Sequence, residues 1–345
     1  IVAALLWLAT LAILAGQLIA FAWILEVVAD VPKWAGCLIA GGVMTIYFAA
    51  GGLLTSAWVN LVQLAVLVVG FGIALPWAWS AAGAWSGIVA AAPPEPDYFN
   101  FWNGGASGVF YVALLVPAFI ISPGLIQKVY GARDERTVRL GVGLSGLALL
   151  LFAAVPPVMG MLAHVYAPGL ENAELALPTV LMLGLPPALG AIGLAAVFSA
   201  EVSSADAILF MLSTSLSEDL YKRFVRPDAS DRQVLRVARW AAVLGGGAGV
   251  ALALGLPSVI GALSVFYTFL SVSLLVPVVA GLHSRKPGTP EALAAIGAGV
   301  ATVVAARLVG ITGGAAWYAT WLGIFVSANA FVLVFAVRGM RARPR

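Results

Sequence analysis

The chain has 345 residues, of which 62% are hydrophobic and only 10% are charged. A soluble domain carries about 25% charged residues because its surface has to stay solvated, so this composition excludes a soluble globular protein. The single cysteine, Cys37, excludes a disulfide framework and a cysteine-rich metal centre. The net charge of +3 does not indicate a nucleic-acid partner, because the basic residues gather at the ends of apolar runs.

Ten apolar runs are long enough to cross a bilayer, which takes roughly 20 helical residues per crossing. The alternation of apolar and polar residues typical of barrel strands is absent from the sequence. We therefore predict an all-α polytopic membrane protein with spans at 1–29, 34–53, 56–80, 105–125, 138–166, 184–214, 237–256, 258–282, 291–311 and 316–337. Because Ile1 lies inside an apolar run, we expect the natural protein to begin further upstream.

Basic residues are segregated among the predicted loops. Sixteen of the 18 Lys and Arg follow the fourth, sixth and eighth runs or lie in the C-terminal tail. The loops at 81–104 and 167–183 contain acidic residues but no Lys or Arg. Since cytoplasmic loops carry an excess of basic residues, we expect a multi-pass protein of the cell membrane whose C-terminus is cytoplasmic.

Three ionisable residues stand out by their depth within the predicted spans, where charge is costly and usually functional. Glu201 and Asp206 lie in the sixth span, and Arg307 lies near the outer end of the ninth, where its long side chain can reach the interface. The sequence contains no Ser/His/Asp set, metal-ligand cluster or nucleotide-binding loop, so we expect a protein that is not an enzyme.

The sixth span also presents oxygen atoms on one face. At about 100° per residue, Ala200, Ser203 and Ser204 fall within one arc of the helix. Two hydroxyls and a backbone carbonyl are ligands of the kind that hard cations prefer. The alternative is that the two serines bond back to the preceding turn and serve only in packing.

The stretch from Ala195 to Arg239 resembles the signature region of the sodium:solute symporter family. The resemblance rests on the serine pair and the acid two residues on, a Ser/Thr-rich continuation, an Asp-Leu-Tyr motif and a basic loop, here Ser203, Ser204, Asp206, Ser213, Thr214, Ser215, Asp219, Leu220, Tyr221, Lys222 and Arg226. Other parts of the chain carry similar family motifs, namely Tyr47, Gly51, Gly52, Trp58 to Gln63, Pro123, Gln127, Lys128, Pro277, Gly281 and His283 to Lys286.

This resemblance implies the inverted-repeat fold of the leucine-transporter type, with the first helices missing from the chain. Residues 1–80 would then end the first repeat, 105–282 would form the second, and 291–337 would be two peripheral helices. The resemblance places the family's sodium site at Ala200, Ser203 and Ser204, with Na+ as the coupling ion. An absent first core helix would supply the remaining contacts, so we expect no transport by this chain alone.

Two departures from the family pattern bear on ion coupling. Asn60 stands where the family has an aspartate, and Glu201 stands where it usually has an apolar residue. We predict that Glu201 strengthens cation binding or couples a proton, with Asp206 and Asn60 as further ion-coupling candidates. A proton-coupled symporter and a transporter-like sensor module remain alternatives to sodium symport.

The fourth span would line the solute cavity, yet it offers few hydrogen-bonding groups between Leu115 and Ser122. A sugar needs many convergent polar groups, and an unmet buried hydroxyl is costly. We therefore expect a small carboxylate, amino acid or partly apolar solute. The candidate lining residues are Phe119, Ser122, Tyr267 and Gln17. The oligomeric state is left open.

Overall fold

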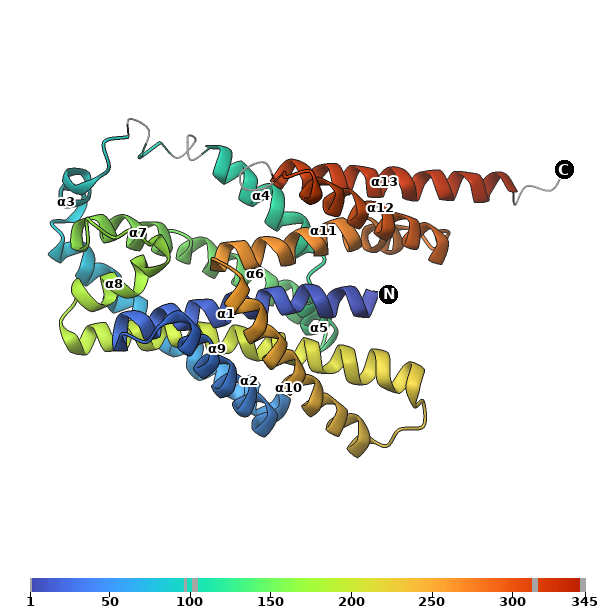
Figure 1. The fold of residues 1–345 in the computed structure, drawn as a ribbon, viewed down its shortest axis with the longest axis horizontal. Helices are drawn as coiled ribbons and strands as arrows, with labels where there is room; N and C mark the ends of the chain where they lie inside the picture. Colours follow the sequence, from blue (N-terminus) through green and yellow to red (C-terminus); the bar gives the residue numbers. More distant parts are fainter. Residues whose placement is uncertain (1, 96–97, 101–104, 312–315, 342–345) are drawn as a thin grey trace. The chain divides into compact units, whose positions relative to one another are not determined.

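The computed structural model describes residues 2–95, 98–100, 105–311 and 316–341 (Figure 1). In this part of the chain the regular structure is entirely helical. The helices are α1 (Val2–Ala29), α2 (Lys33–Ala81), α3 (Ala84–Ala91), α4 (Gly105–Ile120), α5 (Pro123–Tyr130), α6 (Glu135–Phe152), α7 (Val155–Tyr166), a 3-10 turn η1 (Ala173–Leu175), α8 (Ala176–Leu183), α9 (Pro187–Thr214), a π-helix η2 (Ser215–Val225), α10 (Asp231–Gly255), α11 (Val259–His283), α12 (Thr289–Leu308) and α13 (Ala316–Arg341).

The predicted class is confirmed by the lengths and compositions of these helices. Among the described residues, eight segments are long and apolar enough to cross a membrane, and Lys33–Ala49 and Leu114–Ile126 are two of the shorter apolar helical segments. Each of the ten predicted spans overlaps one of these ten segments. The segments from Glu135 to Tyr166 and from Pro187 to Val225 are longer than predicted, because helical residues continue beyond the apolar core of each run.

The second and third predicted spans are joined in the structure as one helix, α2, of 49 residues. A straight helix of that length would measure about 73 Å, more than twice the hydrocarbon thickness. No charge or proline separates the two spans between 50 and 58, so the sequence there contains no helix-ending signal other than Gly51 and Gly52. The side chains of Trp58, Pro123, Gln127 and Lys128, and the surroundings of both glycines, lie outside the described residues.

The fourth predicted span, 105–125, is interrupted in the structure. Helix α4 ends at Ile120 and α5 begins at Pro123. Between them the Ser122 carbonyl accepts the N–H groups of Leu125 and Ile126 at 3.1 and 3.0 Å. The new helix thus starts with its first backbone donors satisfied.

Helix α6 begins where the sequence provides a cap. The Asp134 carboxylate accepts the backbone N–H and the hydroxyl of Thr137, both at 2.7 Å. These hydrogen bonds favour the charged form and hold the pKa of Asp134 below its ordinary value. The cap fixes the start of the helix in the predicted cytoplasmic loop.

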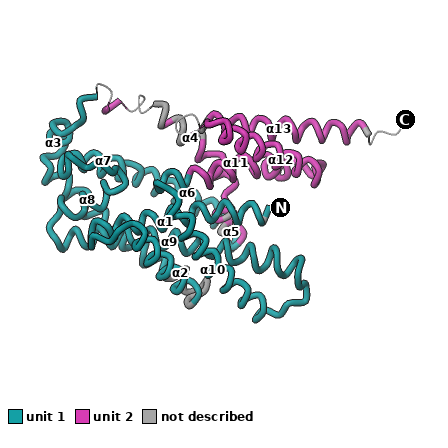
Figure 2. Tube along the Cα trace, in the orientation of Figure 1, with its two compact units in different colours: residues 1–96, 131–263 teal, residues 97–130, 264–345 magenta. Residues whose placement is uncertain are grey.

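The chain separates into two compact units (Figure 2), one formed by residues 1–96 and 131–263 and the other by 97–130 and 264–345. These units cut across the repeat boundaries expected from the family resemblance, which stay predictions. The first unit has a core shared by α1, α2, α9 and α10, in which the largest enclosed side chains include Leu14, Leu18, Met44, Leu209 and Leu212.

One end of the first unit is tied together by charged side chains. The Glu174 carboxylate of η1 accepts the indole N–H of Trp23 at 3.0 Å and the backbone N–H of Val259, the first residue of α11, at 3.0 Å. Lys33 donates to the Leu256 carbonyl at 2.6 Å and lies 5.5 Å from the centre of the Trp23 ring. Glu174 thus satisfies the N–H of Val259 at the start of α11, and Lys33 satisfies the Leu256 carbonyl at the end of α10.

In the second unit, α11, α12 and α13 pack closely around small residues. A Cβ atom added to Gly299 would lie 2.2 Å from the Val272 carbonyl oxygen and 3.2 Å from the Cβ of Ser327. Membrane helices approach each other most closely at such small residues. Gly297, on the same helix, would meet nothing within 4 Å.

We expect Gly299→Ala to destabilise the protein by about 1–3 kcal/mol, because a methyl group there has to push two helices apart. Gly297→Ala is the matched control. It should not destabilise the protein, because alanine is favoured over glycine inside a helix by about 1 kcal/mol. Thermal unfolding of both purified variants in detergent checks the difference. Equal midpoints would show that α11 and α12 are not in close contact at Gly299.

Candidate functional site

The candidate ion site is on α9, whose first half packs tightly against α2. Pro187 occupies the first turn of α9, where a missing N–H costs nothing. A Cβ added to Gly70 of α2 would lie 2.5 Å from the Cβ of Ala196, and one added to Gly193 would lie 3.5 Å from the Cβ of Ala74. These pairs show that α2 and α9 run antiparallel here and approach at backbone distance.

This register extends to the polar residues of the site. Gln63 lies seven residues before Gly70 on the same face of α2, and Ser203 lies seven residues after Ala196 on the same face of α9. The antiparallel packing therefore places Gln63 at the level of Ser203. By the same count, Asn60 is at the level of Asp206.

The two serines of the predicted cation site make no hydrogen bond to any described residue. Ser203 is half-buried and Ser204 is exposed. Further along the same segment, the Ser213 hydroxyl donates to the Leu209 carbonyl at 2.7 Å and the Thr214 hydroxyl donates to the Phe210 carbonyl at 2.9 Å. The serine pair thus differs from its neighbours, and the back-bonding alternative does not describe it.

Three buried oxygen atoms near this level also have no partner among the described residues. They are Oε2 of Glu201 on α9, and Oδ1 of Asn60 and Oε1 of Gln63 on α2. A buried polar atom without a partner is costly, and native structures retain few of them. By the register above, Gln63 lies at the level of Ser203 and Asn60 at the level of Asp206, and Glu201 is two residues before Ser203 on α9. Such a grouping of unpartnered oxygen atoms is typical of a functional site.

Asp206 is buried and, unlike Glu201, does not lack a partner. Tyr47, from the first half of α2, lies within electrostatic reach of its carboxylate. Past Thr214 the helix widens into the π-helix η2, where the Arg226 N–H donates to the Tyr221 carbonyl five residues earlier at 2.9 Å. π-helical turns are rare and often lie at functional sites.

The residues predicted to line the solute cavity are distributed over both units. In the second unit the Phe119 and Tyr267 rings stack, with centroids 5.6 Å apart and planes inclined by 26°. Ser122 is half-buried at the break between α4 and α5. Gln17 is half-buried on α1, in the first unit. The structure therefore brings Phe119 and Tyr267 together, with Ser122 three residues further along the chain.

The oxygen set on α9 fits a small hard cation. The Ser203 and Ser204 hydroxyls are available, and the Ala200 carbonyl oxygen retains a second lone pair after its helical hydrogen bond. Glu201 adds a carboxylate one residue away. No group of three His, Cys, Asp or Glu side chains among the described residues is arranged to hold a metal ion.

Gln63 and Glu174 are two polar residues whose importance was not predicted from the sequence. In the sequence Gln63 stands out only as part of a family motif, although an amide inside an apolar run is itself a signal of function. Glu174 reaches partners 151 and 85 residues away, and no local pattern points to either.

Comparison with known proteins gives consistent matches. The model of the sodium:solute symporter family matches residues 1–299. A high-affinity choline transporter of Drosophila melanogaster is 24% identical over 79% of this chain and 46% of its own length. A sodium/glucose cotransporter of Vibrio parahaemolyticus is 27% identical over 64% of this chain and 46% of its own length. The chain thus spans about half the length of these relatives.

A solved structure shares the fold. A Na+-coupled sialic acid symporter, in a substrate-bound outward-open state, superposes with a TM-score of 0.74 at 16% identity, covering 96% of this chain and 74% of its own. The predicted inverted-repeat fold of the leucine-transporter type is thereby confirmed.

Proposed function

Because the chain belongs to the sodium:solute symporter family, we propose that the full-length protein couples the entry of sodium to the uptake of a small solute by alternating access. The observation that carries this proposal is the serine pair of α9, whose two hydroxyls have no partner among the described residues. We propose Ala200, Ser203 and Ser204 as this chain's part of the sodium site. In transporters of this fold, coupling ions bind between helices near the middle of the membrane.

The solute class follows from the few polar groups available to bind it. Phe119 and Tyr267 offer a stacked aromatic surface and one hydroxyl, and Ser122 offers another. Such a site satisfies a small, partly apolar solute such as an amino acid or a carboxylate better than a sugar. The glucose cotransporter among the relatives makes glucose the stringent negative control.

The orientation proposed from the basic loops places the C-terminus in the cytoplasm. The loop that contains Glu174 then lies outside. Labelling of single cysteines introduced at Glu171 and Arg285, after Cys37→Ser, distinguishes the two faces, because an impermeant reagent applied to intact cells should reach only the first.

The proposed function is tested by uptake into proteoliposomes that contain the full-length protein. An inward sodium gradient should concentrate at least one of the solutes for which relatives of this chain are named, choline, proline and pantothenate, and an equal potassium gradient should not. Glucose should not be concentrated. Uptake driven equally by both gradients, or by a proton gradient alone, would contradict sodium coupling.

Glu201 gives a separate prediction, because a carboxylate next to the proposed site attracts a cation only when it is charged. We expect Glu201→Gln to weaken sodium binding about tenfold and to make the remaining affinity independent of pH. A unit charge 4 Å away is worth about 4 kcal/mol at an effective dielectric constant of 20, so a tenfold loss is a conservative figure.

Glu171→Gln, at an exposed loop position, is the control for the loss of one acidic residue. Sodium titrations of both variants at several pH values provide the measurement. An unchanged affinity and pH profile in Glu201→Gln would remove Glu201 from the coupling machinery. A variant that keeps its sodium affinity but loses only the pH profile would support proton coupling through Glu201.

A further inference from the structure

Two basic residues depart from the segregation of positive charge to the cytoplasmic side, and only one has a visible structural role. Lys33 binds the Leu256 carbonyl and lies over Trp23. Arg307, in the last turn of α12, makes no side-chain hydrogen bond or ion pair with any described residue. Its exposed guanidinium therefore remains available to a ligand.

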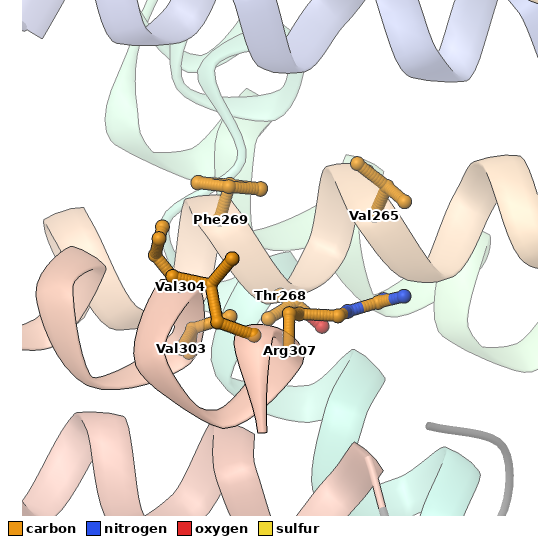
Figure 3. Close-up of a pocket in the computed structure, with 7 residues that line it drawn as sticks. Val265, Thr268, Phe269, Val303, Val304 and Arg307 are labelled. Carbon is orange, nitrogen blue, oxygen red and sulfur yellow. The ribbon is translucent and has the colours of Figure 1, made fainter. Parts of the chain in front are cut away.

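Arg307 borders an apolar cavity of about 320 Å³ that lies within the second unit (Figure 3). The figure shows the arginine side chain extending from the end of α12 alongside α11. The other lining residues are Val265, Thr268, Phe269, Val303, Val304 and Leu308. The volume is at the small end of the roughly 300–1,000 Å³ typical of ligand sites, which suits a narrow chain better than a bulky molecule.

Among the described residues that line the cavity, Arg307 alone has a polar side chain free to contact a ligand. The Thr268 hydroxyl is already hydrogen-bonded to the Thr320 hydroxyl of α13 at 3.2 Å. Val304 and Leu308 are 42% and 83% exposed, so this side of the cavity is open to the surroundings of the helix. An occupant has to be apolar along most of its length and anionic at one end.

Along the helices, the charged residue and the apolar residues of the cavity lie at the levels of a lipid's headgroup and acyl chains. Helix α12 has 20 residues and so measures about 30 Å, the thickness of the hydrocarbon layer. Arg307, one residue from its end, is then at the level of the lipid headgroups. Phe269, ten residues into α11, lies about 15 Å along that helix from its start, at the depth of the acyl chains.

We propose that this cavity binds an anionic phospholipid, with the phosphate on Arg307 and one acyl chain along Val265, Phe269 and Val304. The guanidinium is suited to two parallel hydrogen bonds with phosphate oxygens. In the proposed orientation the lipid belongs to the outer leaflet.

The test is a lipid titration of the purified full-length protein in detergent, followed by native mass spectrometry and thermal unfolding. Dioleoyl phosphatidylglycerol should bind and raise the unfolding midpoint more than dioleoyl phosphatidylcholine. Arg307→Gln should weaken phosphatidylglycerol binding at least tenfold, because the loss of even one of the two charge-assisted hydrogen bonds accounts for about that factor. Val304→Trp, which fills the apolar part, should weaken it similarly.

Arg285→Gln is the matched control, because Arg285 is an exposed arginine of the loop after α11. It should bind phosphatidylglycerol as the unchanged protein does. Dihexanoyl phosphatidylglycerol and inorganic phosphate separate the acyl chain from the headgroup, and both should bind at least tenfold more weakly. The proposal is overturned by equal losses in the Arg307 and Arg285 variants, by full binding in Val304→Trp, or by inorganic phosphate reproducing the stabilisation.

Discussion

Replacing Ser203 and Ser204 together by alanine is expected to lower the affinity for sodium by at least a hundredfold. Each hydroxyl faces the proposed site without a partner among the described residues. A neutral contact to a charged group contributes about 1.5–3 kcal/mol, so losing two costs about two factors of ten or more. Equilibrium binding of radioactive sodium to the purified full-length protein measures the change.

The control for this double substitution is Ser213→Ala. Ser213 is on the same helix and is buried, but its hydroxyl is occupied by the Leu209 carbonyl. It should bind sodium with the affinity of the unchanged protein. If the double variant retained full sodium affinity, the site would have to be moved away from the serine face of α9.

Gly70→Leu is expected to abolish sodium binding by a different route, through the packing of α2 on α9. A single added carbon at Gly70 would already lie 2.5 Å from the Cβ of Ala196 and 3.1 Å from the Ile192 carbonyl oxygen. Leucine adds three more carbons, so the helices have to separate. We expect a loss of stability above the about 1–3 kcal/mol usual for overpacking, together with loss of sodium binding.

Gly72→Leu provides the comparison, because a Cβ atom added at Gly72 would meet nothing within 4 Å. Detergent-solubilised yield, unfolding midpoint and sodium binding should all match the unchanged protein. If the leucine variant cannot be purified, the milder Gly70→Ala variant, which adds one methyl group, can be measured in its place. Equal behaviour at the two glycines would contradict the close approach of α2 and α9.

Much of the fold could be predicted from the sequence because the bilayer imposes a length on each apolar run. The break before Pro123 and the long sixth span were recognisable from proline and from the apolar residues. The continuation of two predicted spans as the single helix α2 could not be predicted, because the glycines at 51 and 52 signal a helix end that the structure does not have. The π-helix η2 was missed because Ser215–Val225 is polar and resembles a helix end followed by a loop.

The candidate site was only partly predictable for a related reason. Helical periodicity places Ala200, Ser203 and Ser204 on one face, since this requires nothing beyond the local geometry. Bringing Gln63 to the level of Ser203 requires the register between α2 and α9, which Gly70 and Ala196 set across 126 residues of sequence. The register between two helices so far apart in the chain cannot be predicted from a single sequence.

The most direct test of the central claim is thermal unfolding of the full-length protein in sodium, potassium and N-methylglucamine chloride at equal ionic strength. An ion that binds only the folded state stabilises it by mass action, by about 2.7 kcal/mol at a hundredfold excess over its dissociation constant. We predict a higher midpoint in sodium than in the other two salts, and no such difference for the Ser203→Ala/Ser204→Ala variant. Equal midpoints in all three salts, or a sodium effect that survives in the double variant, would contradict a sodium site on this face of α9.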